Sequence, residues 1–192
     1  MKLSYFEDKI FVKKDFSHMP LERGEYESCK FINCDFSNTD LSETIFSQCV
    51  FESCNLSMAS LIRTAFRETK FMNCKMLGLR FETCNKPGLS FTLDNCRLEH
   101  SSFYQIKLRN SLFKNTNFTE TDFTEGDLSS SLFDNCNFIM ATFENTVLEK
   151  CDFRTSFNYS IDPERNRIKK AKFSLAGLAG LLDKYDIDTS DK

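Results

Sequence analysis

Large apolar residues recur at every fifth position along most of this chain. One block runs from Phe6 to Phe81, and a second block, shifted by two residues, runs from Leu93 to Phe153. All 29 of these central positions carry Phe, Leu, Tyr or Met, and they hold 18 of the 21 Phe residues. A repeat this strict predicts one small structural unit that is stacked on itself as a solenoid.

A step of five suits neither a helix nor a flat strand, because successive apolar residues would not share one face. From Gly24 onward, a small residue stands two positions before nearly every central residue, as Cys29 does before Phe31. Residues two apart share a face of an extended segment, so each unit places one small and one large residue inward. A corner must follow each unit, so that the next unit also faces inward.

The spacing of identical residues predicts four units in each coil. In the second block, central residues match their counterparts twenty positions on in seven of nine pairs, and fifteen positions on in five of ten. The sequence therefore predicts an all-β solenoid, a right-handed quadrilateral β-helix that forms a single domain over residues 1–192. At about 4.8 Å for each coil, residues 4–155 would form a rod roughly 36 Å long.

Individual repeat units strengthen this interpretation. Units such as CDFSN at 34–38, TDFTE at 121–125 and CNFIM at 136–140 resemble those of the pentapeptide repeat family. The resemblance implies the same quadrilateral β-helix, and it implies no shared activity, because one fold serves many functions.

Two segments interrupt the repeat and divide the chain. Residues 84–92 separate the first block (1–83) from the second (93–155) and contain a Pro-Gly turn signal. This segment is either a bulge where the blocks join or a projecting loop that contacts a partner through Lys86, Pro87 and Gly88. Residues 156–167 are expected to leave the coil as an excursion before residues 168–192 form the final coil and a helix.

The apolar spacing changes to three and four after Phe173. Leu175, Leu178, Leu182 and Tyr185 fit one stripe of a short C-terminal α-helix, with Ser174 placed to cap it. Such a helix would cover the open end of the solenoid. The helix either acts as a cap on a monomer or pairs with the helix of a second copy. Its layout is similar to the tail of quinolone-resistance (Qnr-type) family members. This resemblance implies a homodimer through these four residues.

The cysteines and histidines give no indication of catalysis or metal binding. All nine cysteines occupy the small inward position, without any CxxC pair, and are expected to be buried free thiols. His18 and His100 stand far apart, and a convex rod offers no concave pocket. We therefore expect a non-enzymatic protein without cofactor or metal. The absence of a signal-like or membrane-spanning apolar run predicts a cytoplasmic protein that does not contact membranes.

The resemblance to Qnr-type proteins supplies the first functional hypothesis. Those proteins resemble B-DNA in size and charge and bind type II topoisomerases, so the resemblance implies DNA gyrase or topoisomerase IV as partner, without direct contact to nucleic acid. Between Asn115 and Glu149 the chain has seven acidic residues and no Lys or Arg. This local charge density approaches that of DNA. The candidate contact residues within the window are Glu120, Asp122, Glu125, Asp127 and Glu144.

The charge of the whole chain favours an alternative. A net charge of −3 is far below the charge that DNA carries over the length of the rod. Stacking at twenty residues would also bring Lys107 to Asp127, and Lys114 and Arg154 to Asp134. The competing hypothesis is therefore a scaffold that presents flat β faces to an unknown protein and has no topoisomerase activity.

Overall fold

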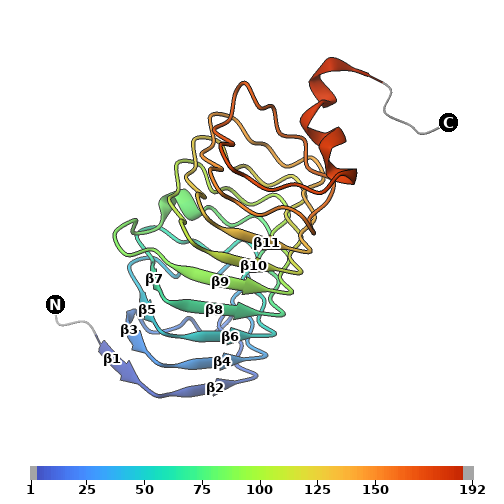
Figure 1. The fold of residues 1–192 in the computed structure, drawn as a ribbon. Coiled ribbons are helices and arrows are strands. Elements are labelled where there is room, and N and C mark those ends of the chain that lie inside the picture. Colours follow the sequence, from blue (N-terminus) through green and yellow to red (C-terminus); the bar gives the residue numbers. More distant parts are fainter. Residues whose placement is uncertain (1–3, 188–192) are drawn as a thin grey trace.

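The chain forms a straight rod of stacked, four-sided coils (Figure 1). The structure, a computed structural model, describes residues 4–187. The N-terminal coil lies at one end of the rod, and two short helices cover the other end. The predicted right-handed quadrilateral β-helix is confirmed.

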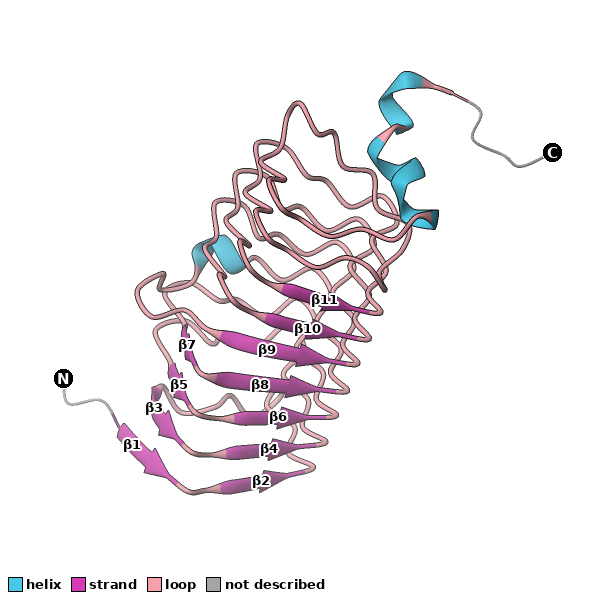
Figure 2. Cartoon of the chain, viewed as in Figure 1, coloured by secondary structure: helices cyan, strands magenta, loops and turns pink. Residues whose placement is uncertain are grey.

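Parallel strands cover two of the four sides, which we call sides A to D in chain order (Figure 2). Side A carries β1 (Ser4–Glu7), β3 (Gly24–Glu27), β5 (Ile45–Ser47) and β7 (Ala65–Arg67). Side B carries β2 (Ile10–Val12), β4 (Lys30–Ile32), β6 (Val50–Glu52), β8 (Thr69–Met72), β9 (Phe91–Asp94), β10 (Leu112–Lys114) and β11 (Leu132–Asp134). Sides C and D are joined by single bridges, such as Asp35 to Asn55 on side C and Ser102 to Asp122 on side D.

The register of the coils shows the predicted step of twenty residues. Phe31 pairs with Phe51, and Phe113 with Phe133. The step is 22 only across the interruption, where Phe71 pairs with Leu93. Four units therefore make one coil, and residues 84–92 contribute two extra residues without changing the sides on which later units lie.

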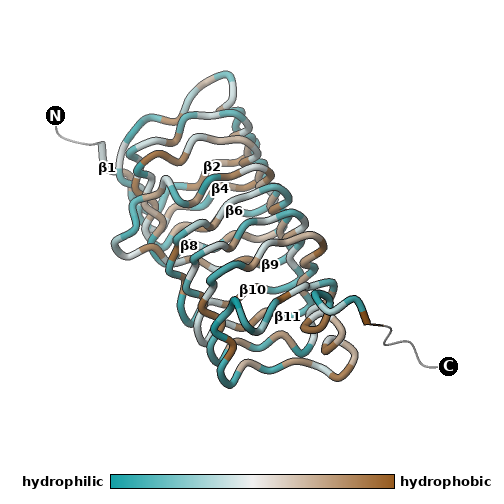
Figure 3. Tube along the Cα trace, turned by 90° about the horizontal axis from the view of Figure 1, so that it is seen from above, coloured by the Kyte–Doolittle hydropathy of each residue, from teal (hydrophilic) through white to brown (hydrophobic). Residues whose placement is uncertain are grey.

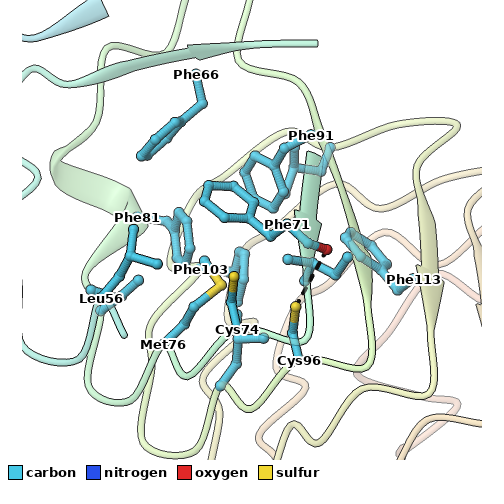
Figure 4. Packing of buried hydrophobic residues seen from close by; sticks show 14 of the residues in the cluster. Leu56, Phe66, Phe71, Cys74, Met76, Phe81, Phe91, Cys96, Phe103 and Phe113 are labelled. Atoms are coloured by element: carbon cyan, nitrogen blue, oxygen red, sulfur yellow. Dashed lines mark hydrogen bonds between the residues drawn. The ribbon is translucent and has the colours of Figure 1, made fainter. Parts of the chain in front are cut away.

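Aromatic ladders fill the interior. Along side D, the Phe123 ring stacks on Phe103 at 5.2 Å and on Phe143 at 5.0 Å. Rings on neighbouring sides meet edge to face, as Phe46 and Phe51 do at 5.2 Å. Hydrophobic and hydrophilic residues alternate along the coils (Figure 3), and the large apolar ones are buried. The close-up in Figure 4 shows the rings of Phe71, Phe81, Phe91 and Phe103 packed together in the interior.

Left-handed residues make most of the corners. The residue two positions after a central residue usually has a positive φ, as in Asn33 (53°), Glu43 (62°) and Glu120 (52°). This conformation costs roughly 1–2 kcal/mol for most L-residues, less for Asn. Its recurrence shows that the stacked coils, rather than local preference, impose the corner.

The first interruption forms a compact loop beside a short 3₁₀-helix, η1 (Phe81–Thr83). Lys86, Pro87 and Gly88 are exposed at its tip, while Leu89 and Phe91 turn inward. Phe91 stacks on Phe81 at 5.2 Å, so the loop contributes its own apolar residues to the core.

The second interruption keeps the coil register. Phe157 still bridges Asn137, and Arg167 still bridges Val147, both at a step of twenty. Tyr159 and Ile161, both buried, fill the interior near Asn158 and Pro163, the two central positions where the repeat lacks a large apolar residue. The expected excursion is therefore confined to a tight turn at residues 162–165.

The helix at the C-terminal end lies where the sequence predicts one, but it is of the 3₁₀ type in two pieces, η2 (Ala176–Leu181) and η3 (Asp183–Tyr185). Gly177 and Gly180 lie directly against Tyr159, where a Cβ atom would clash. The Lys184 ammonium joins η3 to the 162–165 turn through Asp162 (2.8 Å) and Glu164 (2.6 Å). These contacts hold the helices over the last coil.

Candidate partner-binding surface

The small inward position is both a packing site and a hydrogen-bonding site. At most of these positions the side chain donates to the carbonyl of the central residue 23 positions earlier, as in Cys54 Sγ to Phe31 O (3.2 Å), or Thr64 Oγ1 to Leu41 O (2.8 Å). Figure 4 shows the equivalent bond from Cys96 to Phe71, at 3.4 Å. The thiols are thus donors within the core, a role that sequence reasoning missed.

All nine cysteines are buried. Burial raises the pKa of Cys49, Cys84, Cys136 and Cys151 to about 12, so these thiols stay protonated and unreactive near neutral pH. Within residues 4–187, no group of three or more His, Cys, Asp or Glu side chains is arranged to hold a metal ion. Nor does that part of the chain contain a helix long and apolar enough to cross a membrane.

The coil separates the five predicted acidic residues. Asp122 and Glu144 lie on side D, Glu120 lies at the corner between sides C and D, Glu125 lies at the corner between sides D and A, and Asp127 lies on side A. The acidic window of the sequence is therefore not one continuous surface. Reading the chain with a period of twenty shows which acidic residues share a side.

These acidic residues also differ in how strongly they are paired. The Arg109 guanidinium donates to Asp127 from Nε at 2.8 Å. Although burial opposes the shift, hydrogen bonds from Arg109 and Ser129 hold the pKa of Asp127 below its usual range. Glu144 lies 3.3 Å from Arg165. Arg109 therefore largely neutralises Asp127, while Arg165, which also pairs with Asp162, neutralises Glu144 only in part; the linear window included neither arginine.

The other three carboxylates have no Lys or Arg partner among the described residues. Glu120 lies 3.1 Å from His100 Nδ1, Glu125 accepts from the Gln105 amide at 2.7 Å, and Asp122 accepts from the backbone N–H of Thr124 at 2.9 Å. Glu125 also lines a hollow of about 480 Å³ with Lys86 of the loop. The structure thus places Lys86, a predicted loop contact, and Glu125, a predicted acidic contact, around the same hollow.

Side D carries the largest excess of negative charge, and most of its acidic residues were not predicted. Nine carboxylates and four arginines belong to it: Glu22, Asp40, Glu43, Glu82, Asp122, Glu125, Glu144, Asp162 and Glu164, with Arg23, Arg63, Arg80 and Arg165. Side B, opposite, has seven basic and four acidic residues. Three of the four arginines lie in the first four coils, and in the last coil Lys184 of η3 pairs with Asp162 and Glu164. Side D is therefore most negative around Asp122, Glu125 and Glu144.

The predicted residues of the C-terminal helix are exposed. Leu175 is 89% exposed, Leu178 42%, Leu182 36% and Tyr185 53%. The Tyr185 hydroxyl donates to Glu164 at 3.1 Å, which fixes one end of this apolar surface to the last coil.

The pentapeptide repeat region of known proteins matches this chain twice, over residues 24–93 and 88–157. Together these matches cover most of the rod. The chain belongs to the pentapeptide repeat family.

The solved structures that this pentapeptide repeat protein is similar to include QnrB1, a plasmid-mediated fluoroquinolone resistance protein. A trypsin-treated variant of QnrB1 superposes with a TM-score of 0.71 at 17% identity, over 98% of this chain and 92% of that chain. Full-length QnrB1 gives a TM-score of 0.64 at 18% identity, over 96% and 100%. At this identity, the likeness is one of fold. No curated protein matches the sequence.

Proposed function

We propose that this pentapeptide repeat protein is a non-enzymatic binding protein that presents side D to a basic surface of a partner protein. The observation that carries the proposal is the excess of nine carboxylates over four arginines on one side of a rigid rod. Clustered charge of one sign steers a partner of opposite charge and favours its docking.

The partner that we propose is a bacterial type II topoisomerase, DNA gyrase or topoisomerase IV, with the rod occupying the DNA-binding groove. The fold shared with QnrB1, whose name records fluoroquinolone resistance, supports this choice, since fluoroquinolones act on these enzymes. Glu120, Asp122, Glu125 and Glu144 would make the main contacts, and Asp127, paired with Arg109, would contribute little. A topoisomerase partner would place the protein in the cytoplasm.

We also propose that the protein acts as a homodimer joined through the helices η2 and η3. Leu175, Leu178, Leu182 and Tyr185 expose apolar surface at the end of the rod, and an apolar patch of this kind is typical of an interface. Two rods joined end to end would double the length of the acidic side.

A gyrase supercoiling assay with titrated protein tests the topoisomerase proposal. We expect inhibition at micromolar protein that weakens as salt rises, because exposed charges are screened. The variant E120Q/D122N/E125Q/E144Q should lose most of this effect. The control E25Q/D35N/E52Q/E68Q removes as many charges from the other sides and should keep it. If the wild-type protein neither inhibits gyrase, nor protects it from a quinolone, nor competes with DNA at low salt, the proposal is wrong.

The alternative function, a scaffold for an unknown protein, is favoured by a different surface. Side B is a flat sheet of seven parallel strands, and it exposes Ile10, Val12, Met72, Leu112 and Leu132. A scaffold would bind through this sheet, so the side D variant would bind its partner as the wild type does, whereas polar replacements on side B would abolish binding.

A further inference from the structure

The backbone hydrogen bonds that join successive coils on side A are interrupted beside the 84–92 loop. In a regular coil, the residue before the central residue donates to the coil beneath, as Asp127 N–H does to Ile106 O at 2.8 Å. Lys107 bridges Asp127 and holds the same position one coil below. Its N–H has no hydrogen-bond partner among residues 4–187. The wall of the rod is therefore open between Lys107 and the loop.

The path of the loop explains this opening. Asn85 N–H still donates to Thr64 O at 2.9 Å, so the loop begins in register with the coil beneath. Residues 86–88 then turn outward and are exposed, and the chain returns to the interior at Leu89. Figure 1 shows the loop projecting from the rod. The backbone that would pair with Lys107 has thus left the wall.

The hollow of about 480 Å³ lies at this opening. Its apolar lining comes from Leu89 and Ile106, which are only 9% and 1% exposed. Ile106 is a large residue at a position that is small in most units. The other lining residues are polar: Lys86, Gln105, Lys107 and Glu125. The volume falls within the range of roughly 300–1,000 Å³ that is typical of small-molecule sites.

The polar groups around the hollow favour a negative ligand. Neither Lys86 nor Lys107 forms an ion pair with a carboxylate in the part of the chain that the structure describes. The one carboxylate of the lining, Glu125, accepts from the Gln105 amide at 2.7 Å. Two ammonium groups and one backbone N–H therefore remain as donors beside an apolar surface.

We propose that this hollow binds a small carboxylate with an apolar body, of the kind that a medium-chain fatty acid represents. The carboxylate accepts from the Lys107 N–H and pairs with the ammonium groups of Lys86 and Lys107, because charge-assisted hydrogen bonds are the stronger ones. The hydrocarbon covers Leu89 and Ile106, and its removal from water adds to the affinity. This site is independent of any partner on side D, so it goes beyond the proposed function.

Titration of the isotope-labelled full chain with octanoate, followed by backbone amide NMR, tests this proposal. The Lys107 signal should move downfield as its N–H gains an acceptor, and the signals of Leu89 and Ile106 should move with it. The variant K86Q/K107Q should raise the Kd about tenfold, as the loss of two exposed ion pairs implies. The control K30Q/K70Q removes the same charge from side B and should bind as the wild type. Octanol, which lacks the carboxylate, should also bind about tenfold more weakly.

Three outcomes would overturn the proposal. In the first, millimolar octanoate leaves the Lys107, Leu89 and Ile106 signals in place, whether or not other signals move. In the second, K30Q/K70Q weakens binding as much as K86Q/K107Q does, which would assign the effect to net charge. In the third, octanol binds as tightly as octanoate, so that the ammonium groups and the free N–H would not contribute. The amide spectrum of each variant also shows that the rod remains folded.

Discussion

At the scale of single residues, hydrogen bonding explains why this chain uses Cys, Thr and Ser at most small inward positions and Ala at only a few, such as Ala59 and Ala141. A hydroxyl or thiol reaches the carbonyl one coil below, as Ser131 Oγ does to Leu108 O at 2.9 Å. The side chain thereby satisfies a carbonyl that the corner turns inward. A buried polar group without a partner would be costly.

We predict that Thr64→Val lowers the free energy of unfolding by about 1 kcal/mol, because valine keeps the volume but removes the bond to Leu41 O. Urea unfolding measures the change. Thr64→Cys is the matched control, since a thiol donates at many equivalent positions, and it should be closer to the wild type. Equal loss in both variants would mean that the hydrogen bond contributes nothing.

The central position should be much less tolerant of charge. Phe123 is 1% exposed and stacks on a ring above and a ring below, so Phe123→Asp buries a carboxylate without a partner. We expect a loss of more than about 4 kcal/mol and an unfolded protein. Phe123→Leu should fold, because Leu41 and Leu61 occupy the same column. A Phe123→Asp variant that melts like the wild type would disprove the inward placement.

At the scale of elements, the sequence predicts the repeat far better than its exceptions. Strict spacing of large residues specifies side and register, because one coil can stack on the next only with large residues above large residues. Tyr159 and Ile161 do not fall at the five-residue spacing. They are buried because the last coil leaves interior space that no central residue fills. Likewise, the pairing of Arg109 with Asp127 depends on how far the Arg109 side chain reaches toward the next coil, which the spacing of residues does not give.

Tertiary packing explains both the 3₁₀ type of the C-terminal helices and the left-handed corners. Heptad-like leucines predict an α-helix, but Gly177 and Gly180 approach Tyr159 so closely that packing decides the local winding. Left-handed corners occur at Glu43 and Met140, which have no intrinsic preference for that conformation. In both cases tertiary packing overrides the local sequence.

For the C-terminal element we predict that Leu178→Asp with Leu182→Asp yields monomers. Both leucines are over one-third exposed, so charge should disrupt an interface without unfolding the coil beneath. Sedimentation should show half the wild-type mass, with an unchanged β signal in circular dichroism. A wild-type chain that is already monomeric at high concentration would disprove the dimer.

At the scale of the whole molecule, the burial of so many thiols should make the free energy of unfolding fall as the pH becomes alkaline. Burial raises the folded-state pKa of Cys49, Cys84, Cys136 and Cys151 to about 12, whereas unfolded thiols ionise near 8.5. A raised folded-state pKa gives stability that is fully present below the unfolded pKa and declines above it, until the folded pKa is reached.

We therefore expect the free energy of unfolding to fall as pH rises from 8 to 10, before most lysines and tyrosines titrate. Denaturant unfolding at a series of pH values measures the slope. The variant Cys49→Ser with Cys151→Ser should show a shallower slope than the wild type. Constant stability over this range would contradict the burial of these thiols.

The uniform step of twenty residues also means that the length of the regular rod is set in units of one coil. Removing residues 41–60 would delete one whole turn, shorten the rod by about 4.8 Å and return every later side chain to its own side. Removing twenty residues across the 84–92 loop would leave two surplus residues or destroy the loop. Outside loops such as 84–92, the regular coils keep later residues on their sides only if whole turns are added or removed, so the distance between two binding residues on one side changes in steps of one coil.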